Sequence, residues 1–156
     1  YRFSIATNIF ILHRTIGRIK KSVVGLSMYV WFSQMGFPHT TLQFPYKRQS
    51  PLTKKNRDYN TLQEVEEEVL LLSETFSDSQ FTLGRNLYFI LPLFCNPLLL
   101  IKDEHLELMK EYNYMKNYNI PIATSLDQAD SYKLECFDII QREINAVTKY
   151  IGEKNG

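Results

Sequence analysis

The N-terminal part of this chain lacks acidic residues. Residues 1–57 contain ten Lys or Arg and no Asp or Glu, whereas all 17 acids and the other eight bases lie from Asp58 onward. The net charge of +1 therefore divides into +10 for the first 57 residues and −9 for the rest. This asymmetry indicates that one part of the chain meets something anionic: a membrane surface, a nucleic acid or the acidic part of the same chain.

Cysteine, histidine and glycine are too sparse to form a recognisable site. The two cysteines, Cys95 and Cys136, make no disulfide framework, so we expect free thiols packed as small core residues. This favours a reducing compartment or an organelle membrane surface over secretion. The three histidines show no metal-ligand spacing, and no glycine-rich phosphate loop occurs. We therefore predict no metal, no cofactor and no catalytic residue, which favours a non-enzymatic protein.

Hydrophobic runs long enough to span a membrane are also missing. The best candidates are residues 22–37, which include polar side chains, and residues 87–101, which include two prolines. A membrane-spanning helix needs about 20 consecutive apolar residues. We therefore expect the second run to be buried core.

A long amphipathic helix is predicted at the N-terminus. Apolar residues follow one another at alternating spacings of four and three: Ile5, Ile9, Leu12, Ile16, Ile19, Val23, Leu26 and Val30. This heptad seam predicts a helix over residues 3–35, which Gly36 and Pro38 would end. Its length of about 50 Å exceeds the size of a compact chain of this length. We therefore treat residues 1–36 as a basic helical arm.

The arm has the composition of a docking surface. An apolar face, a Lys/Arg face and aromatic residues near the boundary are typical of helices that bind a membrane surface or a partner. The candidate contact residues are Ile9, Leu12, Arg14, Ile16, Arg18, Ile19, Lys21, Tyr29, Trp31 and Phe32. In the alternative interpretation, the seam packs on the protein's own helices, and the bases are solvated or pair with the acidic part.

Residues 37–59 read as a basic, extended linker without periodicity. Three prolines interrupt this stretch, and its basic residues are Lys47, Arg48, Lys54, Lys55 and Arg57. With the neighbouring aromatic residues, they could follow a phosphate backbone. A solvated basic loop is the simpler interpretation.

Residues 60–156 are predicted to form a compact, acidic and mostly helical module. Thr61 and Glu64 make a capping-box pattern that begins a helix to about residue 76. Asp103 can cap a helix to about residue 117, and Asp130 or Ser131 can cap a last helix that Gly152 would stop. The predicted fold is therefore mainly α: the long N-terminal helix, about three further helices and short extended segments.

An α/β arrangement of residues 60–156 is the alternative. The short apolar runs Leu87–Leu91, Leu98–Ile101 and Ile120–Thr124 could be strands, although each contains or adjoins a proline. With that architecture, a nucleotide-binding or hydrolytic module becomes the second functional hypothesis.

Two groups of acids are the remaining candidates for chemistry. Glu66, Glu67 and Glu68 follow the start of a predicted helix, where we expect a solvated face that favours the helix dipole. Asp127, Asp130, Glu135 and Asp138 surround the start of the last helix. They could act as acid and base or bind a cation, but capping explains the two aspartates more simply.

The first functional hypothesis is an interaction or assembly protein, such as an accessory subunit of a membrane-associated complex. It would dock on a protein partner or an anionic membrane surface through the basic N-terminal helix. Nucleic-acid binding through residues 1–57 is a third hypothesis, which requires strong salt dependence. The sequence does not specify an oligomeric state.

Overall fold

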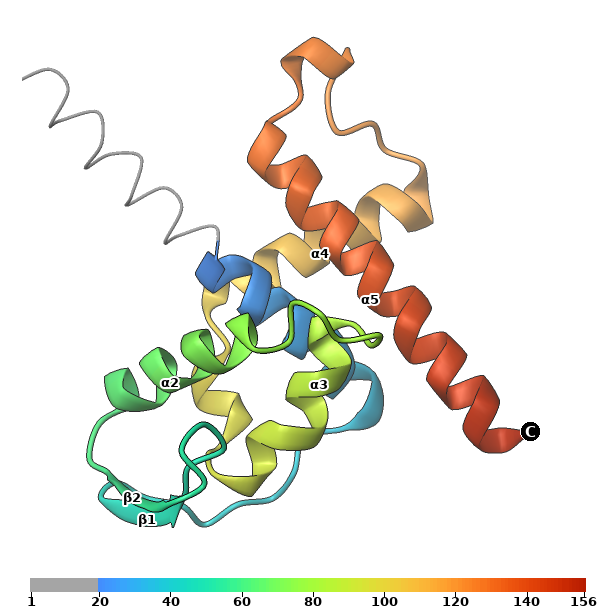
Figure 1. The fold of residues 1–156 in the computed structure, drawn as a ribbon. Coiled ribbons are helices and arrows are strands. Elements are labelled where there is room, and N and C mark those ends of the chain that lie inside the picture. Colours follow the sequence, from blue (N-terminus) through green and yellow to red (C-terminus); the bar gives the residue numbers. More distant parts are fainter. Residues whose placement is uncertain (1–19) are drawn as a thin grey trace, which may run out of the picture.

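The computed structural model describes residues 20–156, and in this part the protein is mainly α-helical (Figure 1). A helix over 20–35, called the N-terminal helix below, comes first. The other elements in chain order are β1 (Tyr46–Gln49), β2 (Asn56–Tyr59), α2 (Leu62–Glu74), α3 (Leu83–Ile90), the 3₁₀ helices η1 (Leu91–Leu93) and η2 (Pro97–Leu100), α4 (Asp103–Tyr118), the 3₁₀ helix η3 (Leu126–Gln128) and α5 (Ser131–Asn155). The prediction of a mainly α fold is confirmed.

The N-terminal helix lies at the centre of the molecule and contributes to two hydrophobic clusters. Val24, Met28 and Phe32 pack in one cluster with residues of α2 and α3. Leu26 and Val30 pack in the other, with residues of α4 and α5. Because residues on opposite faces are buried, this part of the helix must be apolar nearly all round, as its sequence is. The earlier seam positions, from Ile5 to Ile19, lie outside the described residues.

The predicted linker contains a β-hairpin. β1 and β2 pair in an antiparallel two-stranded sheet with Tyr46 opposite Tyr59. The turn closes through the Ser50 backbone N–H, which donates to the Lys55 carbonyl at 2.9 Å, and Lys54 takes a positive φ of 62°. Ser50 and Tyr59 are buried against the body, so this segment does not run free between two parts.

Side-chain caps begin α2 and α5 where the sequence indicates. The Thr61 hydroxyl accepts a hydrogen bond from the Glu64 backbone N–H at 3.3 Å. Glu64 in turn accepts from the Asn60 N–H rather than from that of Thr61. Asp130 caps α5 by accepting from the Tyr132 N–H at 2.9 Å. These bonds satisfy donors that the first helical turn leaves unpaired.

The α/β alternative is wrong for the described part of residues 60–156, which contains no strand after the hairpin. Thr82 caps a helix at the first apolar run, where Leu87 and Leu91 lie one turn apart and are buried together. Pro97 begins η2 at the second run, and the segment 120–124 is irregular. Proline removes a backbone donor that a sheet needs but is accommodated in a first helical turn.

Helices α4 and α5 form a hairpin whose far end projects from the body (Figure 1). Asn119 ends α4 in the left-handed region with φ of 55°, a common helix terminus. The prediction that Gly152 stops the last helix is wrong, since α5 continues to Asn155. Glycine within a helix costs only about 1 kcal/mol relative to alanine, and no proline follows to enforce an end.

Candidate functional site

A buried carboxylate, Glu143, ties three elements together. Its side chain is 1% exposed. It accepts hydrogen bonds from Trp31 Nε1 at 2.8 Å, from the Thr82 hydroxyl at 2.7 Å and from the Gly84 N–H at 3.1 Å. Burial raises the pKa of Glu143, and these hydrogen bonds act against that rise. Because all three donors belong to the protein's own framework, we assign Glu143 a structural role.

Glu68 is a second buried carboxylate with a structural role, and it binds the β-hairpin to α2. It lies 2% exposed and accepts hydrogen bonds from the Ser50 and Tyr59 hydroxyl groups, with the Arg57 guanidinium 3.5 Å from Oε2. The prediction that residues 66–68 form a solvated face is therefore wrong for Glu68. The signal was its helical spacing from Val65 and Leu72, which places it on the buried face.

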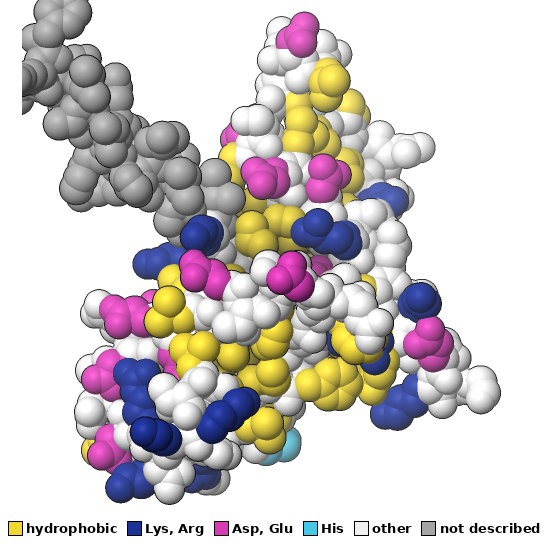
Figure 2. Space-filling view, in the orientation of Figure 1, with side chains coloured by type: hydrophobic (Ala, Val, Ile, Leu, Met, Phe, Trp, Pro, Cys, Tyr) yellow, Lys and Arg dark blue, Asp and Glu magenta, His cyan; other side chains and the backbone are white. Residues whose placement is uncertain are grey.

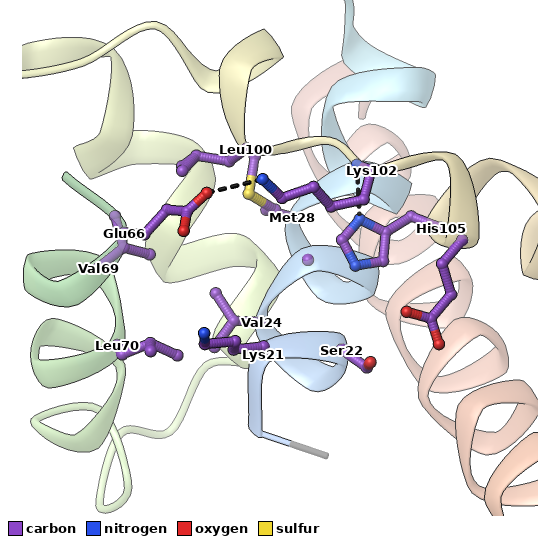
Figure 3. A pocket seen from close by; sticks show the side chains of 12 residues that line it. Lys21, Ser22, Val24, Met28, Glu66, Val69, Leu70, Leu100, Lys102 and His105 are labelled. Carbon is purple, nitrogen blue, oxygen red and sulfur yellow. Dashed lines mark hydrogen bonds and ion pairs between the residues drawn. The ribbon is translucent and has the colours of Figure 1, made fainter. Parts of the chain in front are cut away.

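A recess lies between the N-terminal helix, α2 and the start of α4 (Figure 3). Its volume is about 540 Å³, within the range of about 300–1,000 Å³ that is usual for small-molecule sites. Its walls are mainly apolar and its rim is polar; the lining residues are Lys21, Ser22, Val24, Gly25, Met28, Glu66, Val69, Leu70, Leu100, Lys102, Glu104 and His105. We call this space the helix pocket.

The His105 ring packs against the N-terminal helix at Gly25. A Cβ atom at Gly25 would lie 2.1 Å from His105 Cε1, so only glycine admits the ring at this position. His105 is 4% exposed, and its Nδ1 accepts the Lys102 backbone N–H at 3.1 Å. Burial lowers the pKa of His105, which favours the neutral form of the imidazole. The ring proton therefore lies on Nε2, the nitrogen that points into the helix pocket in Figure 3.

The charged groups of the rim differ in their partners. Lys102 Nζ lies 2.7 Å from Glu66 Oε1, and this ion pair spans the pocket from α4 to α2 (Figure 3). Glu104 accepts the Tyr132 hydroxyl at 2.6 Å. Lys20 pairs with Glu74 at 3.2 Å on the outer side of the N-terminal helix. Lys21, in contrast, is exposed and has no ion-pair partner within the described structure.

The predicted docking residues of the arm fall into two groups. Ile9, Leu12, Arg14, Ile16, Arg18 and Ile19 lie outside the described residues. Of the rest, Lys21 is exposed, Tyr29 is half-buried, and Trp31 and Phe32 are buried at 0% and 1% exposure. The last two therefore fill the protein's own core rather than forming an exposed aromatic boundary, as the packing alternative anticipates for this end of the helix.

The basic residues of the predicted linker cluster on the hairpin. Lys47, Arg48, Lys54 and Lys55 are exposed, and Lys and Arg side chains gather over this region at the lower left of Figure 2. Lys47 lies 3.8 Å from Asp58 on the paired strand. Arg57 turns inward, toward Glu68 and over the Tyr59 ring at 5.0 Å.

The other sequence candidates carry no site. Asp127, Asp130, Glu135 and Asp138 are all exposed, and Asp130 serves as the cap of α5. Both cysteines are buried free thiols, as expected. Burial raises the pKa of Cys95 and Cys136, which disfavours the reactive thiolate.

Apolar side chains are exposed on the far end of the α4–α5 hairpin. Leu126 is 79% exposed and Tyr118 is 69% exposed; Tyr114, Ile120 and Ile122 are exposed as well. Yellow surface runs along this end at the top of Figure 2. We call residues 114–126 the projection. Sequence reasoning missed it because residues 120–124 read as a short strand and residues up to about 117 as a helix.

None of the described helices combines the length and the hydropathy required to cross a bilayer, and the described His, Cys, Asp and Glu side chains form no cluster that could hold a metal ion. Comparisons of the chain with protein-family models, curated proteins and solved structures find no match. The helix pocket, the basic hairpin and the projection are therefore the features that could serve a function.

Proposed function

We propose that this chain is a non-enzymatic interaction protein that binds a protein partner through the projection. The observation that carries the proposal is the exposure of five large apolar side chains on one protruding segment: Tyr114, Tyr118, Ile120, Ile122 and Leu126. Single exposed hydrophobic residues are ordinary, but a group of them on one segment marks an interaction surface. The body supports the segment through the packing of α4 on α5.

The projection offers no cluster of basic residues to an anionic membrane, since Lys116 is its single base and the charged residues that follow it, Asp127 and Asp130, are acidic. No Lys or Arg occurs between residues 117 and 132, while Asp127 and Asp130 are exposed there. An anionic leaflet attracts basic segments and repels acidic ones. A complementary partner would present an apolar recess with a basic rim. The basic segment before residue 20 is a second proposed contact, with the membrane or with the same complex.

The triple variant I120S/I122S/L126S tests this proposal. Because all three side chains are exposed, we expect the purified variant to unfold within about 1 kcal/mol of the wild type. In gel filtration of a native extract, the wild-type chain should elute in an assembly larger than the 18.4 kDa monomer. The variant should elute as the monomer.

Two results would count against the proposal. If wild type and variant elute together in the extract, the projection does not bind the partner. If purified wild type alone elutes as a dimer that the variant loses, the partner is a second copy of this chain rather than a different protein.

Nucleic-acid binding is the second candidate, and the exposed cations of the hairpin favour it. A variant with Lys47, Arg48, Lys54 and Lys55 changed to Gln should lose any binding to single-stranded oligonucleotides. The affinity of the wild type should fall steeply between 50 and 200 mM salt, because phosphate contacts release counterions. Salt-independent binding, or none, removes this candidate.

A further inference from the structure

We propose that the helix pocket binds a small amphipathic carboxylate, with an apolar chain between the N-terminal helix and α2 and a carboxylate at Lys21 and His105. This inference is independent of the partner proposed for the projection. It depends on three features of the pocket: its apolar walls, the neutral imidazole that stands on Gly25, and a lysine that has no ion-pair partner in the described structure.

The walls favour an apolar body for the ligand. Val24, Met28, Val69, Leu70 and Leu100 come from three separate segments and surround the space (Figure 3). A pocket of about 540 Å³ with such walls gains free energy mainly by removing hydrocarbon from water.

The polar head is defined by two donors on one face of the N-terminal helix. Lys21 and Gly25 are four residues apart, so they lie one above the other on the helix. The ring of His105 packs on Gly25, and its Nε2–H points into the same space. Lys21 supplies the positive charge and His105 a neutral hydrogen-bond donor. In Figure 3 the Lys21 side chain extends toward Leu70, so it has to turn along the pocket toward His105 for the two oxygens of one carboxylate to accept from both donors.

The other charged groups of the rim have partners within the protein, although Glu104 keeps its negative charge. Glu66 is neutralised by Lys102 at 2.7 Å. Glu104 already accepts the Tyr132 hydroxyl at 2.6 Å. Lys21 is therefore the rim cation that remains for an external anion among the described residues, and it selects a monocarboxylate over a neutral alcohol.

The probe for the test is dodecanoate, with dodecanol as the neutral control of equal chain length. Isothermal titration of the full chain below the critical micelle concentration should show saturable binding of one dodecanoate per chain. Dodecanol should bind up to about fivefold more weakly, since a partly exposed ion pair is worth up to about that factor.

Two pairs of variants make the result specific. Lys21→Gln should weaken dodecanoate binding about fivefold, whereas Lys20→Gln, which removes the neighbouring paired lysine, should leave it unchanged. Leu70→Trp, on the half-buried wall of α2, should fill the pocket and abolish binding of both probes. The melting temperature of each variant establishes that it folds.

Three outcomes would overturn the inference. The first is an absence of saturable binding by the folded wild type. The second is binding that survives Leu70→Trp, which would place the ligand elsewhere. The third is an equal loss of dodecanoate affinity in Lys20→Gln and Lys21→Gln, which would show that the probe is attracted to the basic surface in general rather than bound at one site. None of these outcomes bears on the projection, so the two proposals fail separately.

Discussion

Replacement of Glu143 by alanine is the sharpest test of how this fold is held together. The change removes the common acceptor of Trp31, Thr82 and Gly84. Each donor left buried without an acceptor costs about 1–3 kcal/mol. Thr82 is half-buried and can turn its hydroxyl to water, but the indole of Trp31 is completely buried, as is Gly84. Two unsatisfied donors therefore remain.

The loss should be about 3 kcal/mol in the free energy of unfolding, because the removal of a buried carboxylate also removes its own desolvation cost. That is a large fraction of the roughly 5–15 kcal/mol that stabilises an ordinary domain. The assay is urea denaturation, followed by tryptophan fluorescence of Trp31, the only tryptophan of the chain. Asp138→Ala, on the exposed face of the same helix, is the matched control and should change stability by less than about 0.5 kcal/mol.

The pH dependence of this loss follows from the raised pKa of Glu143. A carboxyl whose pKa is higher in the folded protein contributes most stability below its unfolded pKa, and that contribution is lost as the pH rises through the folded value. The difference between wild type and Glu143→Ala should therefore be larger at pH 4 than at pH 8. A Glu143→Ala variant as stable as Asp138→Ala at both pH values would refute the assigned role.

Three further changes test other contacts. Gly25→Ala should lower the free energy of unfolding by about 1–3 kcal/mol because the new Cβ would clash with the His105 ring. In a double-mutant cycle, Gly25→Ala combined with His105→Ala should lose less stability than the sum of the two single variants. Burial lowers the pKa of His105 in the folded protein, so as the pH falls the unfolded chain binds a proton at this histidine before the folded protein does. The wild type should therefore lose more stability than His105→Gln below about pH 6.5. Urea denaturation at pH 7 and at pH 5 measures this difference. Tyr59→Phe should cost about 1–3 kcal/mol by removing a donor to buried Glu68, whereas Tyr118→Phe at the surface should be neutral in the same denaturation assay.

The helical fold could be predicted where a periodic apolar pattern coincides with a cap. Thr61 and Asp130 mark the starts of α2 and α5 because their signals are local: one side chain and the amides that follow it. The prediction that Asp103 caps its helix is wrong: Lys102 occupies the N-cap of α4, Asp103 is the first helical residue, and the His105 side chain accepts the Lys102 N–H. The run at Leu87 was ambiguous because five apolar residues fit either a buried strand or a helix. Thr82, five residues upstream, resolves it by capping a helix.

The site was much less predictable, since its parts come from distant segments. His105 and Gly25 are separated by 80 positions in the chain, and nothing local in either segment indicates that they touch. Glu68 and Glu143 lie on apolar helix faces, a pattern that sequence periodicity reveals, but their donors come from other elements. The aromatic residues of the arm fitted a membrane boundary and a core equally well, because both bury the same side chains.

The central claim, that the projection binds a protein partner, is tested most directly by a photoreactive benzoylphenylalanine at position 126, with the same residue at exposed position 148 of α5 as the control. Irradiation in a native extract should yield one discrete cross-linked adduct from position 126. An excess of unlabelled wild-type chain should compete for the partner and suppress this adduct, whereas an excess of the unlabelled variant I120S/I122S/L126S should not. No adduct, or the same adducts from positions 126 and 148, would contradict the account.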